Sequence, residues 1–109
     1  MTNARAHIAD WLDEKFIEQD GILFADGFDS AFLGIAQTAG KPPVASYDID
    51  ECIRVLRARD GMNREEAEEF FAYNVLSAYV GERTPVFVQR MKPNVRTRAL
   101  DARGRLSVL

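Results

Sequence analysis

Four aspartates in the first half of the chain are the residues whose type could bind a hard metal ion. They are Asp26, Asp29, Asp48 and Asp50. Carboxylate oxygens suit Mg²⁺ or Ca²⁺, but the spacing lacks the Asp-x-Asp-x-Asp-Gly pattern of a calcium loop. Asp26 and Asp29 also suit a turn, and Asp48 suits a helix N-cap. We therefore interpret these residues structurally and expect no metal and no other cofactor.

The other groups capable of catalysis stand alone in the sequence. The chain has one histidine, His7, and one cysteine, Cys52. A single cysteine excludes an intramolecular disulfide and a zinc site built from thiolates. His7 has no accompanying Ser or Cys motif, which favours a surface residue. Cys52 falls on the apolar face of a predicted helix, where a buried thiol is inert. We find no catalytic motif and expect a protein that is not an enzyme.

Asn74 interrupts an apolar helical stripe, four residues after Phe70 and four before Ala78. A buried amide needs hydrogen-bond partners, because an unsatisfied one costs about 1–3 kcal/mol. Two roles fit: a bond to neighbouring backbone or to the 26–29 turn, and a polar point in a ligand pocket. We favour the first, since a single polar group does not make a convergent site.

Charged side chains form two candidate binding surfaces. The acidic run on a predicted helix consists of Glu65, Glu66, Glu68 and Glu69. It is either a solvated helix face or a patch that imitates nucleic-acid phosphates toward a basic partner protein. The C-terminal arginines are Arg96, Arg98, Arg103 and Arg105. They would bind a phosphate backbone in a salt-dependent way, although no interleaved aromatic offers a stacking platform. The alternative is a solvated tail.

The charge separates the 109 residues into an acidic body and a basic tail. Residues 1–89, the acidic body, hold 16 acidic and 8 basic side chains, a net charge of −8. Residues 90–109, the basic tail, carry a net charge of +5. The length allows one domain, and the composition excludes a disordered or collagen-like chain. Neither a membrane helix nor a signal peptide is evident, so we expect a cytoplasmic protein without membrane contact.

Residues 21–89 predict a compact α+β domain. Short apolar runs between turn residues predict strands at Ile22–Phe24, Phe32–Ala36, Val44–Tyr47 and Val86–Val88. Capping-box spacings, Asp48 with Glu51 and Asn63 with Glu66, predict helices over 49–60 and 64–80. The element order favours a mainly antiparallel sheet of about four strands with two helices on one face. The expected core contains Phe70, Phe71, Leu56, Ile53, Leu33 and Val86.

Several sequence segments of this domain follow one another at distances that are informative together. They are Asp26–Gly34, Val44–Asp48, Arg59–Phe70, Asn74-Val75 and Gly81–Val88. At these distances the combination resembles a family of small uncharacterised proteins found in bacterial, phage and prophage genomes. The match covers about residues 21–89. The resemblance implies a compact domain and a mobile-element setting, and it brings no catalytic residue to this chain.

An amphipathic helix is predicted over residues 1–20, outside that resemblance. Its apolar stripe consists of Ile8, Trp11, Leu12 and Phe16. The stripe needs a surface to cover it, which is either the chain's own sheet or a second copy. We expect a homodimer with these residues in its interface.

These observations favour a small phage- or prophage-type accessory protein that acts by contact with a host or phage protein. Inhibition of a host defence system, in the manner of anti-CRISPR proteins, is one concrete form. The alternative is a nucleic-acid-associated protein that uses the basic tail. An enzyme with an acidic metal site ranks third.

Overall fold

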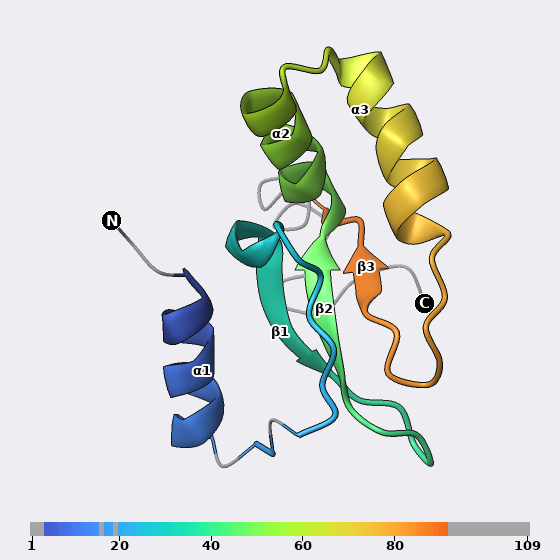
Figure 1. The fold of residues 1–109 in the computed structure, drawn as a ribbon. Coiled ribbons are helices and arrows are strands. Elements are labelled where there is room, and N and C mark those ends of the chain that lie inside the picture. The colour runs from blue at the N-terminus through green and yellow to red at the C-terminus, as the bar shows by residue number, and fades with distance from the viewer. Residues whose placement is uncertain (1–3, 16, 19, 92–109) are drawn as a thin grey trace, which may run out of the picture.

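The computed structural model describes residues 4–15, 17–18 and 20–91. Its helices are α1 (Ala4–Glu14), α2 (Ile49–Asp60) and α3 (Arg64–Phe70), and α3 continues directly into the π-helix η2 (Phe71–Leu76). A 3-10 turn, η1 (Asp29–Ala31), precedes strands β1 (Phe32–Ala36) and β2 (Val44–Asp48), and β3 (Val86–Val88) comes last. The predicted α+β class is confirmed (Figure 1). Within the described ranges, no helix is long and apolar enough to cross a membrane.

β2 is the middle strand of a three-stranded sheet with the order β1-β2-β3. It pairs antiparallel with β1 and parallel with β3. The predicted four-stranded, mainly antiparallel sheet is therefore wrong. The parallel pair arises because α2 leaves the end of β2, α3 and η2 run back, and a loop returns the chain to the start of β3 (Figure 1). Parallel neighbours need such a crossover connection.

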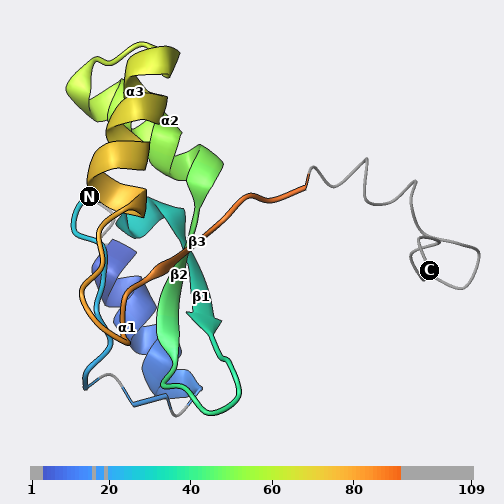
Figure 2. The ribbon, with the colours of Figure 1, turned by 90° about the vertical axis from the view of Figure 1, so that its right-hand side faces the viewer.

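Ile22–Phe24 is the predicted strand that the structure does not form. This segment crosses the face of the sheet instead of extending its edge (Figures 1 and 2). Ile22 is buried, and Phe24 packs against the same core. The next backbone N–H, that of Ala25, donates to the Tyr47 hydroxyl at 2.8 Å. The segment is thus held by apolar packing and by a hydrogen bond to the Tyr47 side chain, without strand pairing.

The two predicted capping boxes differ in outcome. Asn63 and Glu66 form theirs: the Glu66 N–H donates to Asn63 Oδ1 at 2.8 Å, and the Asn63 N–H donates to Glu66 Oε1 at 2.9 Å. Asp48 precedes α2 but makes no side-chain cap bond, and its buried Oδ1 has no hydrogen-bond partner. Glu51 accepts from Arg54 Nε at 2.7 Å instead. The Glu51 carboxylate, which the predicted capping box needed, is therefore bound by the Arg54 guanidinium.

The third helix ends earlier than its predicted boundary at residue 80, because η2 stops at Leu76. Two side chains bond back to carbonyls along this stretch. Asn74 Nδ2 donates to the Phe70 carbonyl at 3.2 Å, and Ser77 Oγ donates to the Tyr73 carbonyl at 2.7 Å. Side chains that bond to the carbonyl four residues earlier compete with the helical ladder and bend it.

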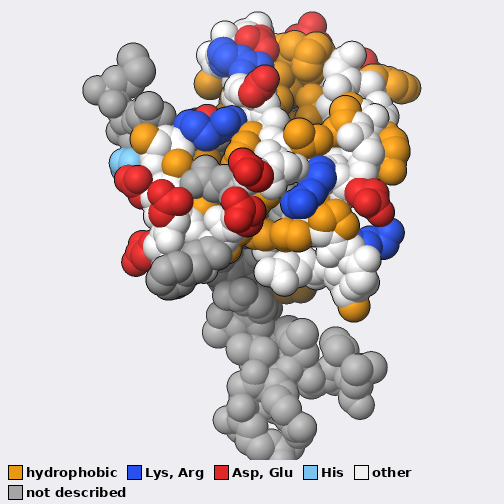
Figure 3. Space-filling model, turned by 60° about the horizontal axis from the view of Figure 1, so that its bottom comes forward, with side chains coloured by type: hydrophobic (Ala, Val, Ile, Leu, Met, Phe, Trp, Pro, Cys, Tyr) orange, Lys and Arg blue, Asp and Glu red, His pale blue; other side chains and the backbone are white. Residues whose placement is uncertain are grey.

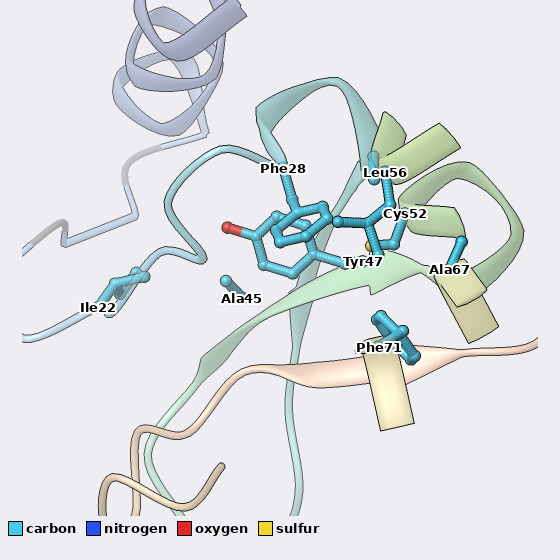
Figure 4. Packing of buried hydrophobic residues seen from close by; sticks show 9 residues of the cluster. Ile22, Phe28, Ala45, Tyr47, Cys52, Leu56, Ala67 and Phe71 are labelled. Carbon is cyan, nitrogen blue, oxygen red and sulfur yellow. The ribbon is translucent and has the colours of Figure 1, made fainter. Parts of the chain in front are cut away.

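The core lies between the sheet, the helices and the segment before η1, with Tyr47 among its members (Figure 4). Its buried residues are Ile22, Phe28, Ala31, Ala45, Tyr47, Cys52, Leu56, Ala67 and Phe71. Aromatic rings connect the layers. Tyr47 stacks on Phe87 with a centroid distance of 5.8 Å, and Phe71 meets Phe87 edge-on at 5.2 Å.

The predicted core is correct at Phe71 and Leu56, and Ile53 is half-buried. It is wrong at Leu33, Phe70 and Val86, which are 41%, 39% and 40% exposed. Leu33 sits where the β1 register shifts and has no paired residue in β2. Adjacent helical residues point about 100° apart, so Phe71 takes the inward position and Phe70 does not. Val86 neighbours the inward Phe87 on a strand and therefore points to the opposite face.

α1 packs against its own chain. Ile8 and Leu12 are buried, and Trp11 meets Phe32 edge-on with ring centroids 6.3 Å apart. The helix ends at Glu14 and not near residue 20. Phe16 of the predicted stripe lies outside the described residues. Of the two packings considered for the stripe, the structure shows the fold-back onto the chain's own sheet. Ile8 and Leu12 are thus buried within one chain, and the homodimer stays a prediction.

Candidate functional site

The four candidate metal-binding aspartates do not gather at one place. Asp29 accepts from Arg5 at 3.0 Å, and Asp26 lies 3.9 Å from the same guanidinium. Asp50 accepts from Gln89 at 2.9 Å, at the start of α2. Among the described residues, no group of three or more His, Cys, Asp or Glu side chains is arranged to hold a metal ion.

The two lone candidates for catalysis are a buried cysteine and an exposed histidine. Cys52 is fully buried in the core. Burial, together with the negative charges of Asp48 and Glu51, raises the pKa of its thiol to about 12. The thiol is therefore protonated at neutral pH and is a poor nucleophile. His7 is exposed on α1 beside a shallow hollow that it shares with Trp11.

The predicted acidic face is exposed along α3, as its sequence position suggests. Glu66 belongs to the capping box, and Glu68 lies 3.8 Å from Arg64. Glu65 and Glu69 are also exposed. The sequence did not predict that exposed aromatic side chains lie beside these carboxylates. Phe70 and Tyr73 follow them on the same helix and are 39% and 79% exposed.

Acidic and aromatic side chains meet in a concavity of about 330 Å³, which we call the α3 hollow. It is lined by Met62, Glu66, Glu69, Phe70, Tyr73 and Asn74. Sequence reasoning missed Tyr73, and placed Phe70 in the core. The available signal was that Phe70 and Tyr73 are three residues apart and share a helix face distinct from that of Phe71.

A larger concavity of about 510 Å³, the apolar pocket, opens beside the end of η2. Its lining comes from three segments: residues 23–28, η2 with the loop that follows, and the start of β3. Phe24, Phe28, Val75 and Phe87 contribute apolar walls. Among the described residues of the lining, Asn74 and Thr84 are polar and Asp26 supplies the single charge. The volume and the apolar lining with a few polar groups are typical of ligand sites.

The wall of the apolar pocket between η2 and β3 is held in place by hydrogen bonds. Thr84 Oγ1 accepts from the Val80 N–H at 2.8 Å and donates to the Gly81 carbonyl at 2.6 Å. Gly81 has a φ of 101°, a conformation that glycine adopts readily. The neighbouring Arg83 donates to the Pro43 carbonyl at 3.0 Å, which ties the loop to the start of β2. The pocket is therefore formed before any ligand arrives.

Asn74 connects the two concavities, because it lines both. Its side chain is exposed and bonds to the Phe70 carbonyl. The expectation of a buried amide is wrong, whereas the expected bond to neighbouring backbone is present. The side chain also lies at a pocket wall, which is the second role considered for it. On the face of the molecule that Figure 3 shows, exposed hydrophobic side chains lie beside acidic and basic ones.

The remaining predicted binding residues, Arg96, Arg98, Arg103 and Arg105, lie outside the described part of the chain. The candidate site that the structure assembles is therefore the α3 hollow together with the apolar pocket. No family model, curated protein or solved structure matches the chain.

Proposed function

We propose that this is a small cytoplasmic accessory protein of the phage or prophage type, which acts by binding another protein and not by catalysis. Inhibition of a host defence system, in the anti-CRISPR manner, is the concrete form that we favour. The sequence resemblance over residues 21–89 supports the mobile-element setting, and the exposed surface of α3 supports the mode of action.

The observation that carries this proposal is the α3 hollow, where Phe70 and Tyr73 are exposed beside Glu66 and Glu69. Tyrosine and phenylalanine are enriched at protein interfaces because they bury a large area with few rotatable bonds. Exposing them costs solubility, so an exposed aromatic group beside charged residues is typical of a contact surface. The carboxylates favour a partner with basic residues around an apolar centre.

Affinity capture from a host lysate with the full chain, followed by mass spectrometry, tests the proposal. We expect the captured partner to be lost with Phe70→Ala or Tyr73→Ala, since both side chains would be buried in the contact. Leu33→Ala is the matched control, because Leu33 is as exposed as Phe70 but lines a different hollow, near α1. Capture that survives both α3 variants would contradict the proposed surface.

The alternative function, nucleic-acid association, is supported by the net charge of +5 in residues 90–109. About four phosphate contacts would give a slope of log K against log salt of roughly −3 to −4. Electrophoretic mobility shift of DNA and RNA across a salt series measures that slope. A full chain that shifts neither nucleic acid at moderate salt excludes this alternative.

A further inference from the structure

We propose that the apolar pocket receives a bulky apolar side chain from an extended segment of the partner protein, and that Asp26 pairs with a Lys or Arg beside that side chain. This inference rests on the proposed function and specifies the chemistry of the partner segment. It concerns the pocket between residues 23–28, η2 and β3, which is separate from the predicted acidic face.

The walls of the pocket select an apolar group. Phe24, Phe28, Val75 and Phe87 surround a space of about 510 Å³, enough for a large aliphatic or aromatic side chain. The hydrogen bonds of Thr84 to Val80 and Gly81 fix the loop that forms one wall of the pocket. This wall therefore keeps the pocket open. A preformed apolar pocket gains affinity because little ordering is needed on binding.

The charge at the rim selects a cation. Asp26 carries the single charge among the described lining residues, and its side chain is fully exposed. Arg5 lies 3.9 Å from Asp26, but the same guanidinium donates to Asp29 at the shorter distance of 3.0 Å and lies over the Phe24 ring at 4.4 Å. Its pairing with Asp26 is therefore the weaker of the two, and a Lys or Arg of the partner can replace it. The acidic body as a whole has a net charge of −8 and attracts basic segments.

The continuity of the surface favours a polypeptide segment over a small molecule. The apolar pocket and the α3 hollow share Asn74, so a chain that crosses this residue contacts both. Asn74 offers an amide that can bond to the backbone of such a chain. Two apolar side chains of the pocket lining, Leu23 and Val80, are 40% and 60% exposed. A segment that enters the pocket and continues past its rim buries more of these two side chains than a small molecule that stays inside the pocket.

Selection of a phage-displayed library of random linear peptides on the immobilised full-length protein tests the inference. We expect the enriched peptides to share a bulky apolar residue next to Lys or Arg. Ala78 is an exposed residue of the pocket lining, so Ala78→Leu places a larger side chain in the pocket. This variant should reduce the affinity for the selected peptides by about tenfold or more. Ala72→Leu is the matched control, because Ala72 is exposed on η2 and does not line the pocket.

The charge pairing has its own variant. Asp26→Asn should reduce the affinity of the basic peptides about two- to fivefold, the size expected for an exposed ion pair. For peptides in which Gln replaces the basic residue, Asp26→Asn should leave the affinity unchanged. Asp10→Asn is the control for a general loss of negative charge, because Asp10 is an exposed residue of α1 away from the pocket.

The outcomes separate this inference from the proposed function. Peptides that lose affinity with Ala78→Leu and Asp26→Asn but not with the controls support the inference. Peptides that depend on Tyr73 and are indifferent to Ala78→Leu overturn it while leaving the α3 contact surface standing. If selection yields no peptide that is sensitive to Ala78→Leu, the inference fails, and the capture experiment with Phe70→Ala and Tyr73→Ala decides the α3 contact surface separately.

Discussion

Tyr47 shows how a single polar atom organises the core of this protein. Its side chain is fully buried, and its ring packs edge-on against Phe32 and stacks on Phe87. Its hydroxyl accepts the Ala25 N–H and so fixes the segment that forms one wall of the apolar pocket. Burial is the main cause that raises the pKa of the Tyr47 hydroxyl above its ordinary value.

Tyr47→Phe should therefore destabilise the protein by about 1–2 kcal/mol, because the Ala25 N–H loses its partner while the ring packing remains. Urea denaturation followed by circular dichroism measures the change. The matched control is Tyr73→Phe, since Tyr73 is 79% exposed. We expect this control to shift the free energy of unfolding by less than about 0.5 kcal/mol. Equal losses in both variants would contradict the role assigned to the buried hydroxyl.

Cys52 should make the protein less stable at alkaline pH. Because the pKa of its thiol is raised to about 12 in the fold, the unfolded thiol loses its proton at a lower pH than the folded one. The free energy of unfolding therefore falls as pH rises from the ordinary thiol pKa toward the raised one. Between about pH 8 and pH 10, we expect the wild type to lose roughly 1–2 kcal/mol more than Cys52→Ala does. Parallel pH profiles of the two proteins in urea denaturation would contradict this.

At the scale of elements, the continuous helix formed by α3 and η2 has two different faces. Ala67 and Phe71 are buried against the sheet side, whereas Phe70 and Tyr73 are exposed in the α3 hollow. The same helix thus stabilises the fold with one face and presents the candidate contact surface with the other. Substitutions on the two faces should separate stability from binding.

Phe71→Ala should cost about 3–5 kcal/mol, because it removes a buried ring that contacts Phe87. Phe70→Ala should cost less than about 1 kcal/mol, because Phe70 is already 39% exposed. Thermal and urea unfolding of the pair measure the difference. A larger loss for Phe70→Ala than for Phe71→Ala would mean that the inward face of α3 is assigned incorrectly.

The two helix N-caps should differ in the same kind of measurement. Asn63→Ala breaks the capping box of α3 and should destabilise by about 1 kcal/mol. Asp48→Ala removes a side chain that makes no cap bond and whose buried Oδ1 has no hydrogen-bond partner. We expect its cost to be smaller than that of Asn63→Ala, although both residues precede a helix. A larger cost for Asp48→Ala would show that its carboxylate stabilises α2 through the helix dipole.

At the scale of the whole molecule, the core and the candidate site both lie within the acidic body. The buried residues of the core cluster run from Ile22 to Phe71, and the lining of the apolar pocket ends at Phe87. The predicted phosphate-binding arginines come after Met91. Stability and partner binding are therefore expected to be independent of residues 92–109.

Truncation after Met91 tests this independence. We expect the free energy of unfolding to change by less than about 0.5 kcal/mol, and the truncated protein to retain its partner in the capture experiment. Any binding to DNA or RNA should disappear, because the truncation removes most of the +5 net charge of the basic tail. Loss of partner capture with an unchanged melting temperature would place the contact surface in residues 92–109.

Local features of the sequence were sufficient to locate the three helices and three of the four predicted strands, but not to set where the first and third helices end. α2 spans the predicted residues 49–60, and the Asn63–Glu66 capping box starts α3 as expected. β1 and β3 also match their predicted ranges. These features depend on neighbours within a few residues, such as a cap, a turn or an apolar period, and a sequence contains all of that information.

Only the tertiary structure decided the direction of the last strand, the path of Ile22–Phe24 and the surfaces that distant segments form together. The direction of β3 depends on how α2, α3 and the loop before β3 return the chain, and not on the residues of β3 itself. Ile22–Phe24 lies over the sheet because the Tyr47 hydroxyl and the core hold it there. The apolar pocket unites segments that are distant in the chain, around Asp26, Asn74 and Phe87. Such contacts arise from the packing of whole elements, so short-range patterns do not encode them.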